Sequence, residues 1–254
     1  MTATEPHSDA VQRLNPPRQR QVAVMFADLD HFTRICAEDP PDHVFRLVRD
    51  FHQLVTDSVS RCNGRLNAYL GDGAMATFGD GAGRIDCATR ALKCALTILE
   101  RIVALNQKLI DSGRRSVSIS LGLQYGQALV GSIAGSKRFG PTVIGDIVNV
   151  ANRLEQRARA LSAKIVVGDE LVQRARREAG PDSSDLAPFV HLGPLSIDGR
   201  DRPVDVWILS TLAIVHHRSH PPTHSTRFER VMSAAKNGFS GDLGRNRVHA
   251  GAPI

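Results

Sequence analysis

The chain has 254 residues, of which 42% are hydrophobic and 23% charged, and its formal net charge is +6 at pH 7. This composition is typical of a globular protein of one or two domains and excludes fibres, coiled coils and wholesale disorder. No apolar run approaches the ~18 residues of a membrane span, and the first residues lack the pattern of a signal peptide. We therefore expect a cytoplasmic protein without an anchor of its own.

The basic residues and the cysteines exclude two further classes of protein. Much of the excess of Lys and Arg lies after residue 215, whereas the middle of the chain is nearly neutral. A nucleic-acid-binding domain carries its basic residues on a folded face, so this distribution argues against a nucleic-acid partner. The four cysteines form no C-x-x-C pair and lie in apolar stretches, which favours reduced core thiols over disulfides or a zinc site.

The two ends of the chain differ from its middle. Residues 1–20 and 213–254 are polar and rich in Pro, Gly, Ser and His. Such segments bury too little apolar surface to fold, so the sequence predicts two disordered ends around one folded domain over residues 21–212.

The first half of this domain predicts strands and helices in alternation. The apolar run 22–29 indicates a buried strand, and apolar residues at helical spacing predict a helix over 42–62. Gly71-Asp72-Gly73 separates two short strands and is typical of a hairpin turn. A long amphipathic helix is expected over 84–110, and residues 116–126 alternate as a half-buried strand does.

The second half adds a hairpin-like segment, a helix over 146–160, and shorter β, α, β and β elements. The order β-α-β-β-α-β with later additions predicts the α+β, ferredoxin-like (split βαβ) arrangement. In it, an antiparallel-dominated sheet is covered by helices on one face.

Two aspartates stand where this fold would bring them together. Asp28 ends the first strand, and Asp72 lies at the tip of the hairpin that would neighbour it. Two carboxylates on a rigid sheet edge, with room for water and phosphate, suit Mg²⁺. A solvated strand end and an aspartate that serves only its turn remain the alternatives.

A second group of polar residues lies in the segment TVIGDIVNVANRLE. Asp146 is suited to cap the helix, and Asn149 and Arg153 then project from one face at i and i+4. An amide and a guanidinium so placed can hold ribose or phosphate oxygens and neutralise charge on a phosphoryl group. The alternative is an exposed polar stripe.

Taken together, these segments resemble the class III nucleotidyl cyclases, the adenylate and guanylate cyclase catalytic domain. The matching stretches are VAVMFADLDHFT, YLGDGAMATFG, ISLGLQYGQALVGSIAGSKRFGPTVIGDIVNVANRLE and, more loosely, DGRDRPVDVW. They follow the family's order over about residues 21–209. A match of several segments is far more specific than one Gly-rich loop.

The resemblance implies a role for each group. Asp28 and Asp72 correspond to the aspartates that bind two Mg²⁺ or Mn²⁺ ions, assisted by the carbonyl of Leu29. Asn149 corresponds to the residue that orients the ribose, and Arg153 to the one that stabilises the pentavalent phosphorus. In the family the metal aspartates come from one subunit and the Asn and Arg from the other, which implies a homodimer with two equivalent sites.

The base-reading and phosphate-binding positions depart from the family. Thr142 falls where one bacterial branch reads the purine edge, but Ala68 stands where a purine-contacting Lys is common. Asp198 likewise replaces a phosphate-binding Lys, and Arg200 or Arg202 could supply the missing charge. An Ala donates no hydrogen bond and an Asp repels phosphate, so both changes bear on substrate binding.

The leading hypothesis is therefore an adenylate cyclase that converts ATP into 3′,5′-cyclic AMP and pyrophosphate, acts in cyclic-nucleotide signalling and needs no membrane span. Two alternatives remain within the same fold. One is a catalytically weak nucleotide-binding or dimerisation module, and the other is a cyclase with relaxed selectivity between ATP and GTP. A nucleic-acid-binding protein is disfavoured because only 5% of residues are aromatic, which leaves few stacking platforms.

Overall fold

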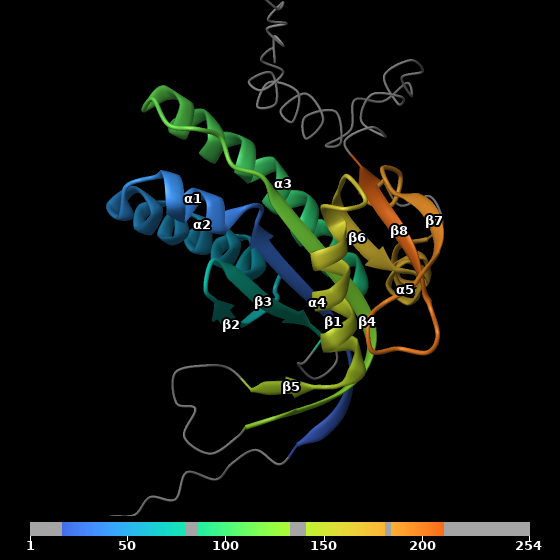
Figure 1. Cartoon of the computed structure of the whole chain (residues 1–254). Coiled ribbons are helices and arrows are strands. Elements are labelled where there is room, and N and C mark those ends of the chain that lie inside the picture. Colours follow the sequence, from blue (N-terminus) through green and yellow to red (C-terminus); the bar gives the residue numbers. More distant parts are fainter. Residues whose placement is uncertain (1–16, 80–85, 133–140, 181–183, 211–254) are drawn as a thin grey trace, which may run out of the picture.

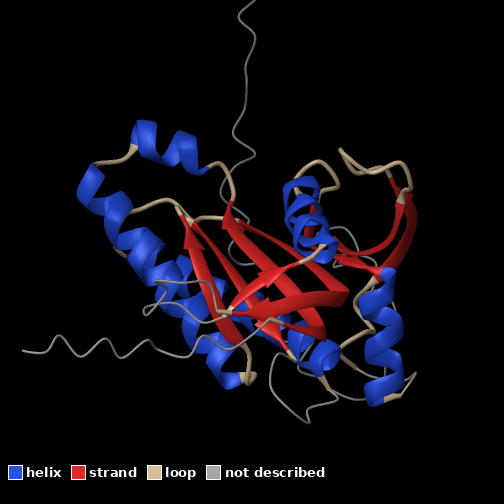
Figure 2. Ribbon diagram, turned by 90° about the horizontal axis from the view of Figure 1, so that it is seen from below, coloured by secondary structure: helices blue, strands red, loops and turns tan. Residues whose placement is uncertain are grey.

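An eight-stranded sheet forms the centre of the molecule, and helices pack on both of its faces (Figures 1 and 2). The structure is a computed structural model, and it describes residues 17–79, 86–132, 141–180 and 184–210. The predicted tail 213–254, and residues 1–16 of the predicted N-terminal segment, lie outside the described residues. No helix within the described ranges is long and apolar enough to cross a membrane.

Apart from one short helix, α1, the elements follow one another in the predicted order. In chain order they are β1 (Arg18–Leu29), α1 (Phe32–Glu38), α2 (Pro41–Arg61), β2 (Arg65–Leu70), β3 (Gly73–Phe78), α3 (Cys87–Asp111), β4 (Ile119–Gly131), β5 (Thr142–Ile144), α4 (Asp146–Ala158), β6 (Ala163–Gly168), α5 (Asp169–Ala179), β7 (Val190–Leu195) and β8 (Val204–Ser210). The strand order is β2-β3-β1-β4-β6-β8-β7, with β5 paired to β4. Of these pairings only that of β4 with β6 is parallel. The expected α+β fold with an antiparallel-dominated sheet is confirmed.

The helices divide between the two faces of the sheet, which corrects the expectation that they cover one face. On β1, Met25 and Leu29 belong to the core that α2, α3 and α5 cover, whereas Val24 and Phe26 pack with α4 on the other face. Alternate residues of a strand point to opposite faces, so a strand that is buried throughout requires a helix on each side. The continuous apolar run of β1 reflects this double burial.

Gly122 allows α4 to approach the sheet closely. A Cβ atom at this position of β4 would lie 2.2 Å from the carbonyl oxygen of Ala151 and 2.2 Å from the backbone nitrogen of Glu155. Both atoms belong to the backbone of α4 and cannot move independently of the helix. A glycine is therefore required here for close backbone packing.

The structure differs from the sequence prediction at two places near the N-terminus. β1 begins at Arg18, three residues before the expected domain boundary, because Arg18 to Gln21 continue the ladder with β4. α1 was not predicted. It is seven residues long and buries none of them fully, so it lacks the apolar period by which helices are recognised.

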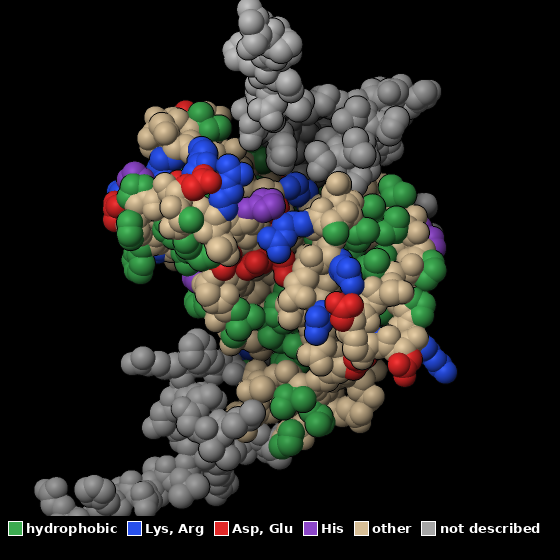
Figure 3. Space-filling view, in the orientation of Figure 1, with side chains coloured by type: hydrophobic (Ala, Val, Ile, Leu, Met, Phe, Trp, Pro, Cys, Tyr) green, Lys and Arg blue, Asp and Glu red, His purple; other side chains and the backbone are tan. Residues whose placement is uncertain are grey.

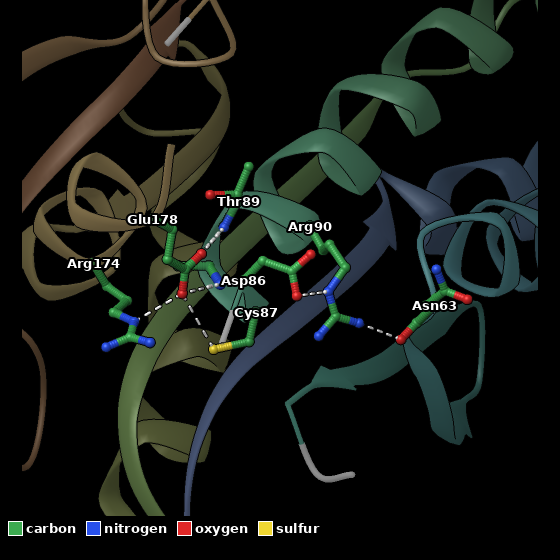
Figure 4. A network of polar contacts seen from close by, with 8 residues as sticks. Asn63, Asp86, Cys87, Thr89, Arg90, Arg174 and Glu178 are labelled. Atoms are coloured by element: carbon green, nitrogen blue, oxygen red, sulfur yellow. Dashed lines mark hydrogen bonds and ion pairs between the residues drawn. The ribbon is translucent and has the colours of Figure 1, made fainter. Parts of the chain in front are cut away.

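A polar network fixes the first turn of α3 against its neighbours (Figure 4). Glu178 of α5 accepts the backbone N–H of Thr89 at 2.8 Å, and Arg174 donates to the same carboxylate at 2.8 Å. From the other side of the turn, Arg90 donates to Asp86 at 2.9 Å and to the carbonyl of Asn63 at 2.6 Å. The carboxylate satisfies N–H groups that a helix start leaves without a partner. The network ties α3 to α5 and to the chain entering β2.

The cysteines are all reduced, as expected, but not all of them are buried. Cys62, Cys87 and Cys94 lie in the core, whereas Cys36 is exposed on α1. Among the described residues, no cluster of three or more His, Cys, Asp or Glu side chains could hold a metal ion by itself.

Candidate active site

Asp28 and Asp72 meet at one edge of the sheet, as the sequence predicted. β1 pairs with β3 up to Ala27 and Ala74, and the two-residue turn Gly71-Asp72 carries the second carboxylate next to the end of β1. The approach is so close that a Cβ at Gly73 would lie 2.5 Å from Asp28 Oδ1. The hairpin turn therefore brings the two carboxyl groups together.

The negative charge of Asp72 disfavours ionisation of Asp28, whereas a hydrogen bond with Asp28 favours ionisation of Asp72. The pKa of Asp28 is raised to about 6, first by burial and then by the negative charge of Asp72. The pKa of Asp72 is also raised by burial, although the backbone N–H of Leu29 partly opposes the rise. Asp72 Oδ2 is buried and has no hydrogen-bond partner. Such a pair favours a cation, because a cation would relieve the repulsion and use the oxygen that the protein leaves unsatisfied.

An aromatic pair lies beside the turn that carries Asp72. His52 of α2 stacks on Tyr69 of β2 with a ring-centroid distance of 4.1 Å, and the Tyr69 hydroxyl lies 2.6 Å from Thr56 Oγ1. Burial lowers the pKa of His52, while the charge of Asp72 acts in the opposite direction. This contact was not predicted, because a single His on an amphipathic helix gives no signal of what it will contact.

Glu155 of α4 is a third acidic group near the pair, and it was also missed. Its side chain lies on the sheet side of α4, and only 5% of the residue is exposed. Its pKa is raised to about 8, chiefly by burial and next by the charge of Asp28, while Arg159 lowers it. Glu155 is therefore protonated near pH 7 in the absence of a cation.

We expect Glu155→Gln to flatten the pH dependence of stability. The unfolded chain releases the Glu155 proton near pH 4.5 and the folded chain near pH 8. Between these values the free energy of unfolding therefore falls by about 1.4 kcal/mol for each unit by which the pH rises. Glutamine does not titrate, so the variant lacks this contribution to the pH dependence. Urea unfolding at pH 6.5 and 8.0, with a chelator present, should show a smaller loss in the variant. Parallel losses in both proteins would contradict the assignment.

Asn149 and Arg153 lie on the exposed side of α4, one helical turn apart, as predicted. Arg153 Nη1 is 4.0 Å from Asp198 Oδ2, and Arg157 Nη2 is 3.1 Å from Asp198 Oδ1. Within the described part of one chain, we find no contact of Asn149 or Arg153 with the two aspartates. The carboxyl pair and the pair of Asn149 and Arg153 therefore form two separate groups in the described part of one chain.

The residues after Asp198 do not simply replace the missing lysine. Arg200 Nη1 lies 2.9 Å from Asp146 Oδ2, at the first turn of α4, and Arg202 is exposed. Arg200 thus neutralises a carboxylate one turn before Asn149. Together with Arg153 and Arg157 it places positive charge along α4 from its first turn to its last, and Asp198 is the carboxylate that faces Arg153 and Arg157.

The base-reading candidates are brought near each other by the fold. Ala68 lies in β2 and Thr142 begins β5, 74 residues later. Asn67, beside Ala68, donates from Nδ2 to the carbonyl of Pro141, beside Thr142, at 3.1 Å. Positions 68 and 142 therefore lie close to each other within a single chain.

Acidic side chains gather at the centre of the face that Figure 3 shows, with Lys, Arg and His side chains beside them. They lie in the hollow between the lobe of α1 and α2 and the surface of α4 (Figures 1 and 3). A negatively charged substrate would meet cationic side chains at the rim and would need a cation at the centre.

Comparison with known proteins identifies the family of this chain. The family model described as the adenylate and guanylate cyclase catalytic domain matches residues 14–210. Adenylate cyclase 1 of Rhizobium meliloti is 27% identical over 189 residues, which cover 74% of this chain and 27% of that protein. An adenylate cyclase of Anabaena cylindrica is 25% identical over 192 residues, which cover 74% of this chain and 36% of that protein. The chain thus spans about a third of the length of these curated relatives.

Solved structures share the fold. The adenylyl cyclase CyaB from P. aeruginosa superposes with a TM-score of 0.65 at 22% identity, over 76% of this chain and 95% of that one. The guanylyl cyclase Cya2 gives the same TM-score and identity, over 76% of this chain and 93% of that one. Cyclases named for either nucleotide are thus equally similar to it in fold. The matched family model covers nearly all of the described residues, and the chain belongs to the adenylate and guanylate cyclase catalytic-domain family.

Proposed function

We propose that the chain is an adenylate cyclase, which converts ATP into 3′,5′-cyclic AMP and pyrophosphate at a site shared by two copies of the chain. The observation that carries this proposal is the pair of adjacent carboxyl groups at the sheet edge, Asp28 and Asp72, with raised pKa values and one buried, unpartnered oxygen. Its support is membership of the cyclase family and the similarity to adenylate cyclases of two bacteria.

The donor set fits Mg²⁺ or Mn²⁺. Both ions prefer oxygen ligands, and two carboxylates with the carbonyl of Leu29 leave positions for triphosphate oxygens and water. When bound, two such ions would lower the pKa of the 3′-hydroxyl and neutralise charge on the triphosphate. Asp28 and Asp72 are the residues proposed to hold them.

The remaining residues position the substrate. In the reaction the 3′-oxygen forms a bond to the α-phosphorus and its proton passes to solvent, while the bond between the α-phosphorus and the oxygen that bridges it to the β-phosphorus breaks and pyrophosphate leaves. We assign Asn149 to orient the ribose and Arg153 to neutralise charge on the α-phosphoryl group. Among the described residues Arg153 forms an exposed ion pair with Asp198 at 4.0 Å, with side-chain exposures of 45% for Arg153 and 73% for Asp198, so the substrate competes for it readily.

A second copy of the chain completes the site. One chain presents its carboxyl pair at the sheet edge and its Asn149 and Arg153 on the outer side of α4. A twofold dimer would place the first group of each subunit opposite the second group of its partner and form two equivalent sites.

The second candidate function is a cyclase-fold module with little catalysis. The observation that favours it is Asp198, which faces Arg153 and Arg157 where a phosphate-binding lysine is common. A carboxylate here weakens the attraction for the triphosphate. The two candidates are separated by whether turnover occurs, not by whether nucleotide binds.

Product formation is the direct test. The purified chain is incubated with ATP or GTP and with Mg²⁺ or Mn²⁺, and the products are separated by chromatography. We expect 3′,5′-cyclic AMP and pyrophosphate in equal amounts. Nucleotide binding without cyclic product from either nucleotide would favour the module and overturn the proposed activity.

We expect measurable product from both nucleotides, with ATP preferred, because Ala68 cannot donate a hydrogen bond to the base. Ala68→Lys restores a donor and should raise the ATP-to-GTP ratio of kcat/KM by about tenfold, the effect of one hydrogen bond in a recognition site. The measurement is this ratio in both proteins. Strong ATP selectivity in the parent, unchanged by the substitution, would mean that another residue reads the base.

A further inference from the structure

Asn67 occupies an irregularity in β2 beside the base-reading position. Leu66 pairs with Ala76 of β3, but Ala68 pairs with the next residue, Met75, so Asn67 is an extra residue in the ladder. A bulge of this kind bends the strand and re-aims a side chain, and bulges are frequent beside active sites.

The Asn67 amide bridges two strands. Thr77 Oγ1 of β3 donates to Asn67 Oδ1 at 2.9 Å, and Asn67 Nδ2 donates to the carbonyl of Pro141 at 3.1 Å. A carbonyl can only accept, so the contact with Pro141 fixes which end of the amide faces it. Thr77 is fully buried and holds the other end. The amide therefore has one orientation.

β5 is a short strand that the contact with Asn67 meets at its entry. It is three residues long, and among the described residues it pairs only with β4, through Leu129, Val130 and Gly131. The chain enters it at Pro141, the residue that Asn67 holds. Consecutive residues are separated by one short virtual bond, so fixing Pro141 against Asn67 also fixes Thr142 relative to Ala68.

We propose that Asn67 is a positioning residue for base selection: through Pro141 it holds Thr142 at a fixed place beside Ala68, so that the purine edge meets a rigid donor and acceptor. This inference rests on the proposed function, because it takes Thr142 as the reader of the base. Because a hydroxyl both donates and accepts, Thr142 can discriminate between purines only by the place at which it is held, and a reader on a loosely held strand would adapt to either purine.

Two substitutions of Asn67 distinguish a loss of its hydrogen bonds from a general effect on the fold. Asn67→Asp has the same shape and keeps the acceptor for Thr77, but it loses the donor to Pro141. Asn67→Ala removes both bonds. Tyr69→Phe is the matched control, because it breaks a hydrogen bond of the same strand to Thr56 of α2 and leaves β5 untouched.

The readout is the ratio of kcat/KM for ATP to that for GTP, measured in the parent and in Ala68→Lys, where selectivity is larger. We expect both Asn67 variants to lower this ratio by about tenfold, mainly through a higher KM for ATP, and Tyr69→Phe to leave it unchanged. A purely structural role would reduce turnover of both nucleotides equally. An unchanged ratio in Asn67→Asp would overturn the inference.

Binding provides a second readout that does not need turnover. 3′-Deoxy-ATP and 3′-deoxy-GTP lack the attacking hydroxyl, so their dissociation constants report selection alone. The ratio of the two constants should move toward unity in the Asn67 variants. Selective binding by a parent that forms no cyclic product would overturn the proposed function alone, whereas product formation with unchanged selectivity in the variants would overturn the inference alone.

Discussion

Asp28→Ala and Asp72→Ala are each expected to lower kcat by about 10³-fold or more, because each removes a carboxylate proposed to hold the ions that stabilise the reacting phosphoryl group. Neither variant should unfold. Burial raises the pKa of both carboxyl groups, so each carboxylate carries a desolvation cost that its replacement by Ala removes. Thermal unfolding in a chelator and cyclic-nucleotide formation at saturating Mn²⁺ are the two measurements.

Asp30, directly after the same strand, offers a contrasting control. Its carboxylate accepts hydrogen bonds from Ser118 and Ser120 and lies 3.6 Å from Lys164 Nζ, so the protein satisfies it fully. Asp30→Asn should therefore lower the free energy of unfolding, by about 1–3 kcal/mol, rather than abolish the chemistry. If Asp28→Ala or Asp72→Ala lost stability in the same way and kept most of its activity, the assignment of the metal pair would be wrong.

A mixture of inactive Asp28→Ala and inactive Arg153→Ala is expected to regain activity. In a heterodimer, one site contains the intact carboxyl pair of one chain and the intact Arg153 of the other, while the second site contains both lesions. With random pairing at equal amounts, half the dimers are mixed, and about a quarter of the parental activity should return. Product formation per chain is measured across a range of mixing ratios.

A second mixture tests the same geometry in the opposite direction. Asp28→Ala and Asp72→Ala damage the same half of the site, so their heterodimer has no intact site and should stay inactive. Recovery in both mixtures would point to an artefact of mixing. No recovery with Asp28→Ala and Arg153→Ala, in a sample shown by native mass measurement to contain heterodimer, would mean that each chain completes its own site.

Residues whose role follows from local pattern were accessible from the sequence. The apolar runs and helical spacing predicted the order of β1, α2, β2, β3 and α3, because each of these elements buries one regular face or, for β1, both. The Gly-Asp-Gly turn fixed the hairpin, and the hairpin placed Asp72 beside Asp28. Their contact was therefore predictable, since it depends on one turn and one strand pairing.

Residues whose role depends on distant packing were not accessible. Glu155 looked like one more polar position of α4, and only the close approach of that helix at Gly122 buries it near Asp28. Asn67 looked like a strand residue, and its contact with Pro141 joins positions 74 residues apart. α1 was not predicted because it buries no residue fully and so lacks apolar residues at helical spacing.

Periodicity and motifs along the chain were enough to predict the fold class, the family resemblance and the pairing of the two carboxyl groups. Which face α4 covers, which carboxyl groups carry raised pKa values and which strand holds Thr142 became evident only from the folded chain. Those properties arise from burial and from contacts between segments far apart in sequence. Neither the hydrophobic period nor a short motif encodes the distance between two such segments, which only the packed sheet and its helices set.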